Sequence, residues 1–155
     1  MNALARKVGR RLKASGAKLA TAESCTGGWV AQAVTAISGS SAWFERGFVT
    51  YSNEAKQEML GVKRGTLKKH GAVSEATARE MAKGALRRSR ATLAVAVTGV
   101  AGPTGGSDTK PVGMVCFSWA TKKKRWSETR RFRGNRESVR RQSVVHALKG
   151  VLKRG

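Results

Sequence analysis

The residues whose types and spacing could perform chemistry lie in the segment Thr21-Ala-Glu-Ser-Cys-Thr-Gly-Gly-Trp29. The apolar run at 17–22 predicts a buried strand, and the spacing of apolar residues after Trp29 predicts a helix, so Ser24 is expected at the junction. N–H groups at a helix N-terminus lack partners within the helix and favour negative charge, so they could hold an oxyanion or a phosphate. Those groups belong to Cys25, Thr26 and Gly27. The structural alternative is that Ser24 or Thr26 only caps the helix.

A serine nucleophile needs a base, and neither histidine is well placed to serve. His70 lies in a basic connection, and His146 lies inside the last predicted helix. A lysine can accept the proton if burial or nearby positive charge leaves its amine neutral near pH 7. Lys56 is the best candidate, because it follows Tyr51 on a short predicted helix while most other lysines fall in exposed clusters. The default alternative is a solvated surface lysine. Cys25 is the competing nucleophile, because a thiol at a helix N-terminus can have a lowered pKa, but it has no evident histidine partner.

Two further segments could hold a ligand. Residues 98–107 form a glycine-rich loop after the apolar run Leu93–Val97, which is typical of a strand buried on both faces. In open α/β sheets, the loop at the end of such a strand commonly binds ligands. The final predicted helix presents three arginines, at 136, 140 and 141, in its first turns, where they oppose the helix dipole. They suggest a nearby anion, and the alternative is simply a basic surface helix.

Alternating helical and strand patterns extend along the chain. The expected strands lie at 18–21, 43–51, 93–97, 112–120 and 125–132, and the expected helices lie at 4–12, 24–37, 53–60, 74–87 and 136–152. We expect residues 62–73 to be a surface connection that includes about one helical turn. This order predicts a single three-layer α/β/α domain with a mixed sheet over residues 1–155.

Composition limits the possible classes of protein. A chain of 155 residues with 40% apolar residues can bury one substantial core. No secretory signal or membrane span is apparent, so we expect a cytoplasmic protein without a membrane partner. The two cysteines lack CxxC spacing, which predicts neither a metal site nor a disulfide framework. No dinucleotide-binding or P-loop motif is present, and we expect no cofactor.

The charge is unusual, with 31 Lys and Arg residues against 9 Asp and Glu residues, a formal net charge of +22. Such a surface attracts polyanions, because neutralising phosphates releases counterions. The basic residues are dispersed, and no basic strand carries the aromatic residues that stack bases. We therefore expect a generally basic surface whose nucleic-acid binding, if it occurs, is non-specific.

Four motifs, in order along the chain, resemble the CinA C-terminal-domain family. They are TAESCTGG at 21–28, GSSAWFERGFVTYSNEAK at 39–56, TGVAGPTGG at 98–106 followed by KPVG at 110–113, and FRGNRESVRRQ at 132–142. This family contains deamidases that hydrolyse the carboxamide of nicotinamide mononucleotide to release ammonia. Longer CinA proteins carry an additional N-terminal domain, and this chain resembles the stand-alone form. The basic charge is the marked departure, since the family's activity does not require it.

The resemblance implies a serine–lysine dyad of Ser24 and Lys56, which agrees with the candidates taken from the residues. Lys56 would take the serine proton, and Ser24 would attack the carboxamide to form an acyl-enzyme that water hydrolyses. Tyr51 could hydrogen-bond the lysine or the leaving group, or it could pack in the core. The donors available to the substrate phosphate are Ser40, Ser41, Thr98, Gly99, Gly102, Gly106 and Arg140. We also expect a homo-oligomer. The alternative function is a basic nucleic-acid-binding module on the same fold without amidase activity.

Overall fold

The structure, a computed structural model, describes residues 1–155. Its five strands are β1 (Leu19–Glu23), β2 (Phe44–Val49), β3 (Leu93–Gly99), β4 (Met114–Ala120) and β5 (Arg125–Arg131). Its helices are α1 (Asn2–Ser15), α2 (Trp29–Thr35), α3 (Asn53–Leu60), α4 (Arg64–His70), α5 (Glu75–Arg87) and α6 (Arg136–Arg154), with a short 3₁₀ helix at Ser40–Ala42. No helix is both long enough and apolar enough to cross a bilayer.

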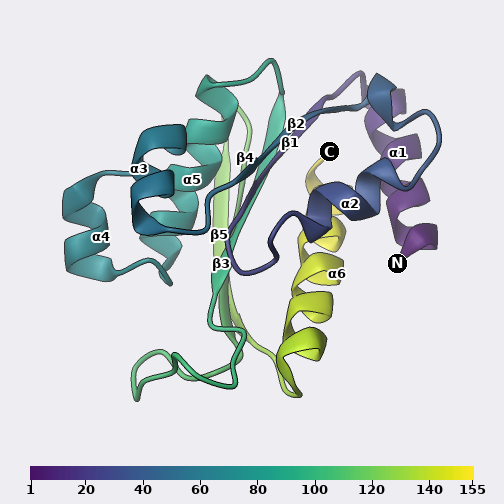
Figure 1. The fold of residues 1–155 in the computed structure, drawn as a ribbon. Coiled ribbons are helices and arrows are strands. Elements are labelled where there is room, and N and C mark those ends of the chain that lie inside the picture. Colours follow the sequence, from purple (N-terminus) through teal and green to yellow (C-terminus); the bar gives the residue numbers. More distant parts are fainter.

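The strands form one mixed sheet in the order β2-β1-β3-β4-β5. β1 is parallel to β2 and to β3, whereas β4 is antiparallel to both of its neighbours. Helices α1, α2 and α6 cover one face of the sheet, and α3, α4 and α5 lie on the other side (Figure 1). The predicted three-layer α/β/α architecture with a mixed sheet is therefore confirmed.

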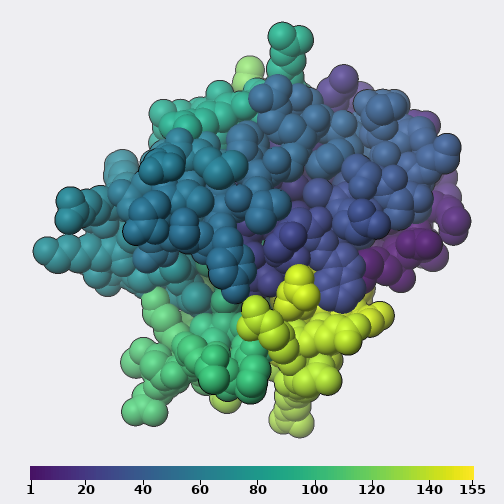
Figure 2. Space-filling model, viewed as in Figure 1, coloured from purple at the N-terminus to yellow at the C-terminus, as the bar shows by residue number.

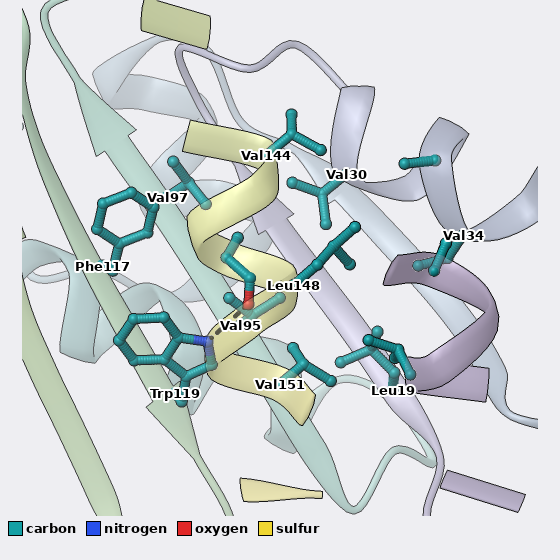
Figure 3. Packing of buried hydrophobic residues seen from close by; sticks show 14 of the residues in the cluster. Leu19, Val30, Val34, Val95, Val97, Phe117, Trp119, Val144, Leu148 and Val151 are labelled. Atoms are coloured by element: carbon teal, nitrogen blue, oxygen red, sulfur yellow. Dashed lines mark hydrogen bonds between the residues drawn. The ribbon is translucent and has the colours of Figure 1, made fainter. Parts of the chain in front are cut away.

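The two faces of the sheet carry side chains of different size, because side chains alternate along each strand. In β3, Leu93, Val95 and Val97 point toward α1, α2 and α6, where they join a core that includes Trp119 and Leu148 (Figure 3). The alternate positions include five alanines, which share a second core with residues of α3 and α5: Ala20 and Ala22 in β1, Ala94 and Ala96 in β3, and Ala120 in β4. The alanines let α5 approach the sheet closely, and α3, which carries Lys56, packs against α5.

The strand register brings three loops to one edge of the sheet. Glu23, the last residue of β1, lies opposite Val49 of β2 and Val97 of β3. Since these strands are parallel, the segments that follow them leave from the same edge. Strand order also reverses around β1, and this is where open α/β sheets place ligands.

The structure corrects two predicted element boundaries. The second helix begins at Trp29 instead of Ser24, because residues 24–28 form a separate turn. Residues 64–70 form the helix α4, which is longer than the single turn that the sequence predicted in a surface connection. Helix α4 packs against α5. This contact stabilises α4 although its sequence contains a glycine, which has a low helix propensity, and three basic residues.

Candidate active site

The turn after β1 holds Ser24 at the edge of the sheet. The Ser24 N–H donates to the Val97 carbonyl at 2.9 Å, and the Gly27 N–H donates back to the Ser24 carbonyl at 3.0 Å. Gly27 and Gly28 have φ angles of 59° and 96°, which favour glycine over residues with a side chain. The chain can thus reverse between strand and helix while Ser24 stays next to β3.

Glu23 occupies the N-terminus of α2, a role that the sequence analysis missed. Its buried carboxylate accepts hydrogen bonds from the Thr26 hydroxyl at 2.7 Å and from the N–H groups of Val30 and Ala31 at 2.8 and 3.0 Å. Burial raises the pKa of Glu23, and these hydrogen bonds oppose the rise. The start of this helix is therefore not available to a substrate anion. The carboxylate directly before Ser24 was the only sequence signal.

Lys56 and Ser24 are in direct contact. The Lys56 Nζ lies 3.0 Å from the Ser24 Oγ, 2.9 Å from the Thr50 carbonyl oxygen and 3.1 Å from the Tyr51 carbonyl oxygen. Ser52 caps α3 by accepting from the Ala55 N–H, which places Lys56 in the first turn of the helix with its side chain directed back to β2. Segments that follow two strands, together with one helix, thus hold these two side chains in contact.

The Lys56 amine has no counter-charge. Only 1% of the residue is exposed, and no carboxylate forms an ion pair with it. Burial lowers the pKa of Lys56, because an ammonium group loses more hydration than a neutral amine does. A neutral amine can donate to the two carbonyl groups and direct its lone pair at the serine hydroxyl. This geometry suits a lysine that acts as a general base.

Cys25 does not have the environment of a reactive thiol. Burial raises the pKa of Cys25 to about 12, so the thiolate is scarce at neutral pH. The nearest helix N-terminus, which could have lowered this pKa, is occupied by Glu23. The side chain packs in the larger core.

The backbone of the same turn presents two free donors. The N–H groups of Cys25 and Thr26 donate no hydrogen bond within the chain, whereas that of Gly27 is used by Ser24. Arg140 donates to the carbonyl oxygens of Cys25 and Thr26 at 3.0 and 3.2 Å, and the first of these carbonyls belongs to the same peptide group as the Thr26 N–H. Because N–H and C=O point in opposite directions across a trans peptide, these contacts orient the Thr26 N–H away from Arg140.

A cavity of about 360 Å³ opens over Ser24 and Lys56. Its wall includes Thr98, Gly99 and Gly102 of the loop predicted to bind ligand, and Arg136 from the start of α6. The Thr98 hydroxyl donates to the Ala72 carbonyl oxygen, so it fixes the loop. Figure 2 shows the β3–β4 loop in green and the first turns of α6 in yellow side by side at the surface.

Several residues named from the sequence lie elsewhere. Ser40 and Ser41 precede β2, whose first residue pairs with Leu19, so they lie at the opposite edge of the sheet from Ser24. Gly106 belongs to the glycine-rich loop but does not line the cavity. The Tyr51 side chain is 61% exposed, so it has no core role, and its backbone carbonyl rather than its hydroxyl contacts Lys56.

Comparisons with known proteins agree with this fold over its whole length. The family model "CinA C-terminal domain" matches residues 1–154. Nicotinamide-nucleotide amidohydrolase PncC of Shigella flexneri is 58% identical over 148 residues, covering 94% of this chain and 88% of the relative. PncC of Pseudomonas putida is 51% identical, covering 98% and 95%.

Solved structures give the same result. The competence/damage inducible protein CihA of Agrobacterium tumefaciens superimposes with a TM-score of 0.96 at 47% identity, covering 98% of this chain and 93% of that structure. A CinA superfamily protein of Klebsiella pneumoniae has a TM-score of 0.95 at 41% identity, covering 99% and 96%. The chain therefore belongs to the CinA C-terminal domain family.

Proposed function

We propose that this protein is an amidohydrolase that converts nicotinamide mononucleotide to nicotinic acid mononucleotide and ammonia. The observation that carries the proposal is the 3.0 Å contact between Ser24 Oγ and a buried Lys56 Nζ without a counter-charge. The PncC relatives that are 51–58% identical to this chain are named nicotinamide-nucleotide amidohydrolases, which supports this choice of amide.

In the proposed reaction, neutral Lys56 removes the Ser24 proton as Oγ attacks the carboxamide carbon. The resulting lysine ammonium then gives this proton to the departing nitrogen, and ammonia leaves behind an acyl-enzyme. Water, deprotonated by the same amine, hydrolyses the ester and restores Ser24. The carbonyl groups of Thr50 and Tyr51 hold the amine in place through both half-reactions.

The negative charge that develops on the carboxamide oxygen needs fixed donors. The N–H groups of Cys25 and Thr26 are the free donors of the turn, and they replace the three-amide set expected from the sequence. Arg140 acts as a positioning residue for the Thr26 N–H, because it holds the Cys25 carbonyl oxygen on the other side of the same peptide group.

The test is an ammonia-release assay on nicotinamide mononucleotide, nicotinamide and glutamine. We expect turnover of the mononucleotide to exceed that of the other two amides by orders of magnitude. Comparable turnover of free nicotinamide or glutamine would overturn the assignment of a nucleotide substrate.

The net charge of +22 favours a second property, the binding of nucleic acid. A dispersed basic surface predicts weak binding that is indifferent to sequence and is lost steeply with salt. Neutralising Lys122, Lys123, Lys124 and Arg125 should weaken binding modestly and leave deamidation unchanged, because this β4–β5 turn lies outside the cavity. Tight binding above roughly 0.2 M salt would instead indicate a selected nucleic-acid role.

A further inference from the structure

Arg136 lines the cavity over Ser24 and Lys56, yet most of its hydrogen-bonding capacity is unused. Its Nη1 donates to the Gly102 carbonyl oxygen at 2.8 Å, and its Nη2 lies 3.4 Å from the Tyr51 hydroxyl. These contacts use two of the five N–H groups of a guanidinium, and no carboxylate pairs with it. The side chain is exposed, so its free donors are accessible to a ligand.

The cavity contains no carboxylate. Of the residues that line it, only Lys56 and Arg136 are basic, and none is acidic. Lys56 must be neutral to act as a base, which leaves the Arg136 guanidinium as the permanent charge of the cavity. An anionic group of the ligand is thus attracted to one position, at the start of α6.

The other anion-binding candidates have partners within the chain. Arg140 donates to the carbonyl oxygens of Cys25 and Thr26, and the N-terminus of α2 holds the Glu23 carboxylate. Ser40 and Ser41 are at the opposite edge of the sheet.

We propose that Arg136, together with the adjacent loop at 102–105, binds the phosphate monoester of the substrate and determines the preference for a nucleotide over its nucleoside. This inference rests on the proposed function, because it needs an amide at Ser24. Tyr51 connects the two ends of the cavity, since its carbonyl contacts Lys56 and its hydroxyl faces Arg136. The carboxamide and phosphate of nicotinamide mononucleotide are likewise at opposite ends of the molecule, separated by the pyridine and ribose rings. A planar guanidinium can donate two parallel hydrogen bonds to phosphate, which an ammonium group cannot do.

The test compares nicotinamide mononucleotide with nicotinamide riboside, which lacks the phosphate. Arg136→Gln should lower kcat/KM for the nucleotide by roughly 10- to 100-fold and change that for the nucleoside by less than about twofold. Arg136→Lys should retain part of the preference, because it keeps the charge without the two parallel donors. The matched control is Arg141→Gln, on the same helix, where the arginine pairs with Glu137 outside the cavity.

Equal losses with both substrates would overturn the proposal, since they would mean that Arg136 only fixes the loop through Gly102. An unchanged preference in Arg136→Gln would overturn it as well. The affinities of both ligands for Ser24→Ala, with and without Arg136→Gln, supply a readout independent of turnover. If the unmodified protein releases no ammonia from the nucleotide, the proposed function fails, while a phosphate-dependent affinity that needs Arg136 still supports the subsite.

Discussion

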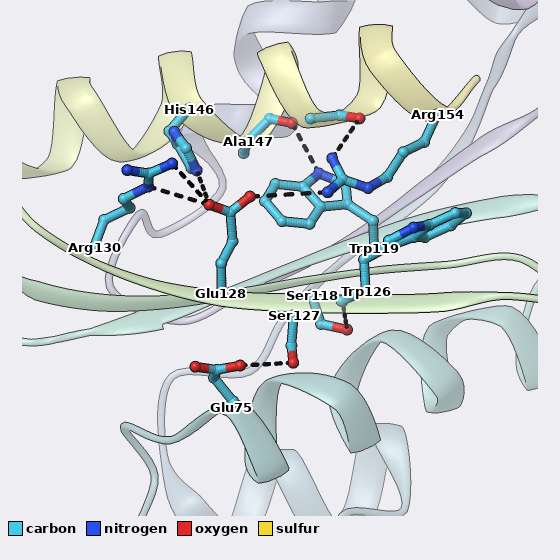
Figure 4. A network of polar contacts seen from close by, with 11 residues as sticks. Glu75, Ser118, Trp119, Trp126, Ser127, Glu128, Arg130, His146, Ala147 and Arg154 are labelled. Atoms are coloured by element: carbon cyan, nitrogen blue, oxygen red, sulfur yellow. Dashed lines mark hydrogen bonds and ion pairs between the residues drawn. The ribbon is translucent and has the colours of Figure 1, made fainter.

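Two basic side chains that are largely removed from solvent have opposite surroundings in this molecule. Lys56 is 1% exposed and contacts only two carbonyl groups and the Ser24 hydroxyl. Arg154, near the end of α6, has an 11% exposed side chain, lies 3.8 Å from the Glu128 carboxylate and stacks 4.2 Å from the Trp119 ring centroid (Figure 4). The lysine lacks a partner of opposite charge, and the arginine has one.

This difference determines which of the two side chains could act as a base and which has only a structural role. Burial lowers the pKa of both groups, and for Arg154 the charge of Glu128 opposes the shift. An arginine remains protonated under these conditions, so Arg154 can only pack and pair. The ordinary pKa of a lysine is lower than that of an arginine, so burial can leave the lysine amine neutral. A neutral amine can accept a proton and act as a base.

The largest expected effect comes from breaking the contact of Lys56. Ser24→Ala and Lys56→Met should each lower kcat/KM by about 10³-fold or more, because both act in one proton-transfer unit. For the same reason, the double variant should lose little more than either single variant. Ammonia release from folded proteins measures this, with the exposed Lys83→Met as control. Losses that multiply, or near-normal turnover in either single variant, would contradict the dyad.

The pH dependence of turnover tests the protonation state of Lys56. Because its pKa is lowered, the neutral fraction grows as pH rises toward that value, so kcat/KM should rise about tenfold per pH unit and then level off below the ordinary lysine pKa. Between the lowered pKa and the ordinary lysine pKa, the unfolded chain binds this proton where the folded chain does not, so the free energy of unfolding should rise with pH over that interval, in which the rate has levelled off. Lys56→Met should remove this contribution. A rate that falls as pH rises toward the lowered pKa would exclude a neutral lysine base.

Removing the contacts of Arg154 should lower the stability of the fold and leave catalysis unchanged. Arg154→Met removes the ion pair with Glu128 and the stacking on Trp119, and we expect the free energy of unfolding to fall by about 1–3 kcal/mol. Urea titration measures the loss, and Lys153→Met, an exposed neighbour, is the control. Loss of ammonia release in folded Arg154→Met would contradict the purely structural role of this arginine.

The smallest effect is expected at Cys25. Cys25→Ala removes a buried thiol but keeps the backbone N–H group, so activity should change by less than about threefold. Ammonia release is the readout, together with thiol labelling in the presence and absence of substrate. Loss of activity at full stability, combined with substrate-protected labelling, would favour cysteine chemistry.

The sequence by itself identified the strand that precedes Ser24, the helix that follows the turn, and the helix that carries Lys56. It also predicted an α/β fold with a mixed sheet. These features depend on apolar periodicity and on short motifs, which are local properties of the chain. It also excluded both histidines, and the structure places His146 against Glu128 and Phe117, within the core side of α6.

Only the tertiary structure decided which polar groups remain free. The parallel register of β1 and β2 places Ser40 and Ser41 at the opposite edge of the sheet from Ser24, although the sequence offered them as donors to the phosphate. Arg136 and Arg140 lie one helical turn apart, yet Arg140 is used by the turn after β1 and Arg136 faces the cavity. Glu23 fills a helix N-terminus that the sequence offered to a ligand. For Ser40, Ser41 and the two arginines, the deciding partner is a strand or a carbonyl group far away in the chain, and local sequence patterns carry no information about it. For Glu23 the partners are only three to eight residues away, but the turn at 24–28 must form before its carboxylate can reach them.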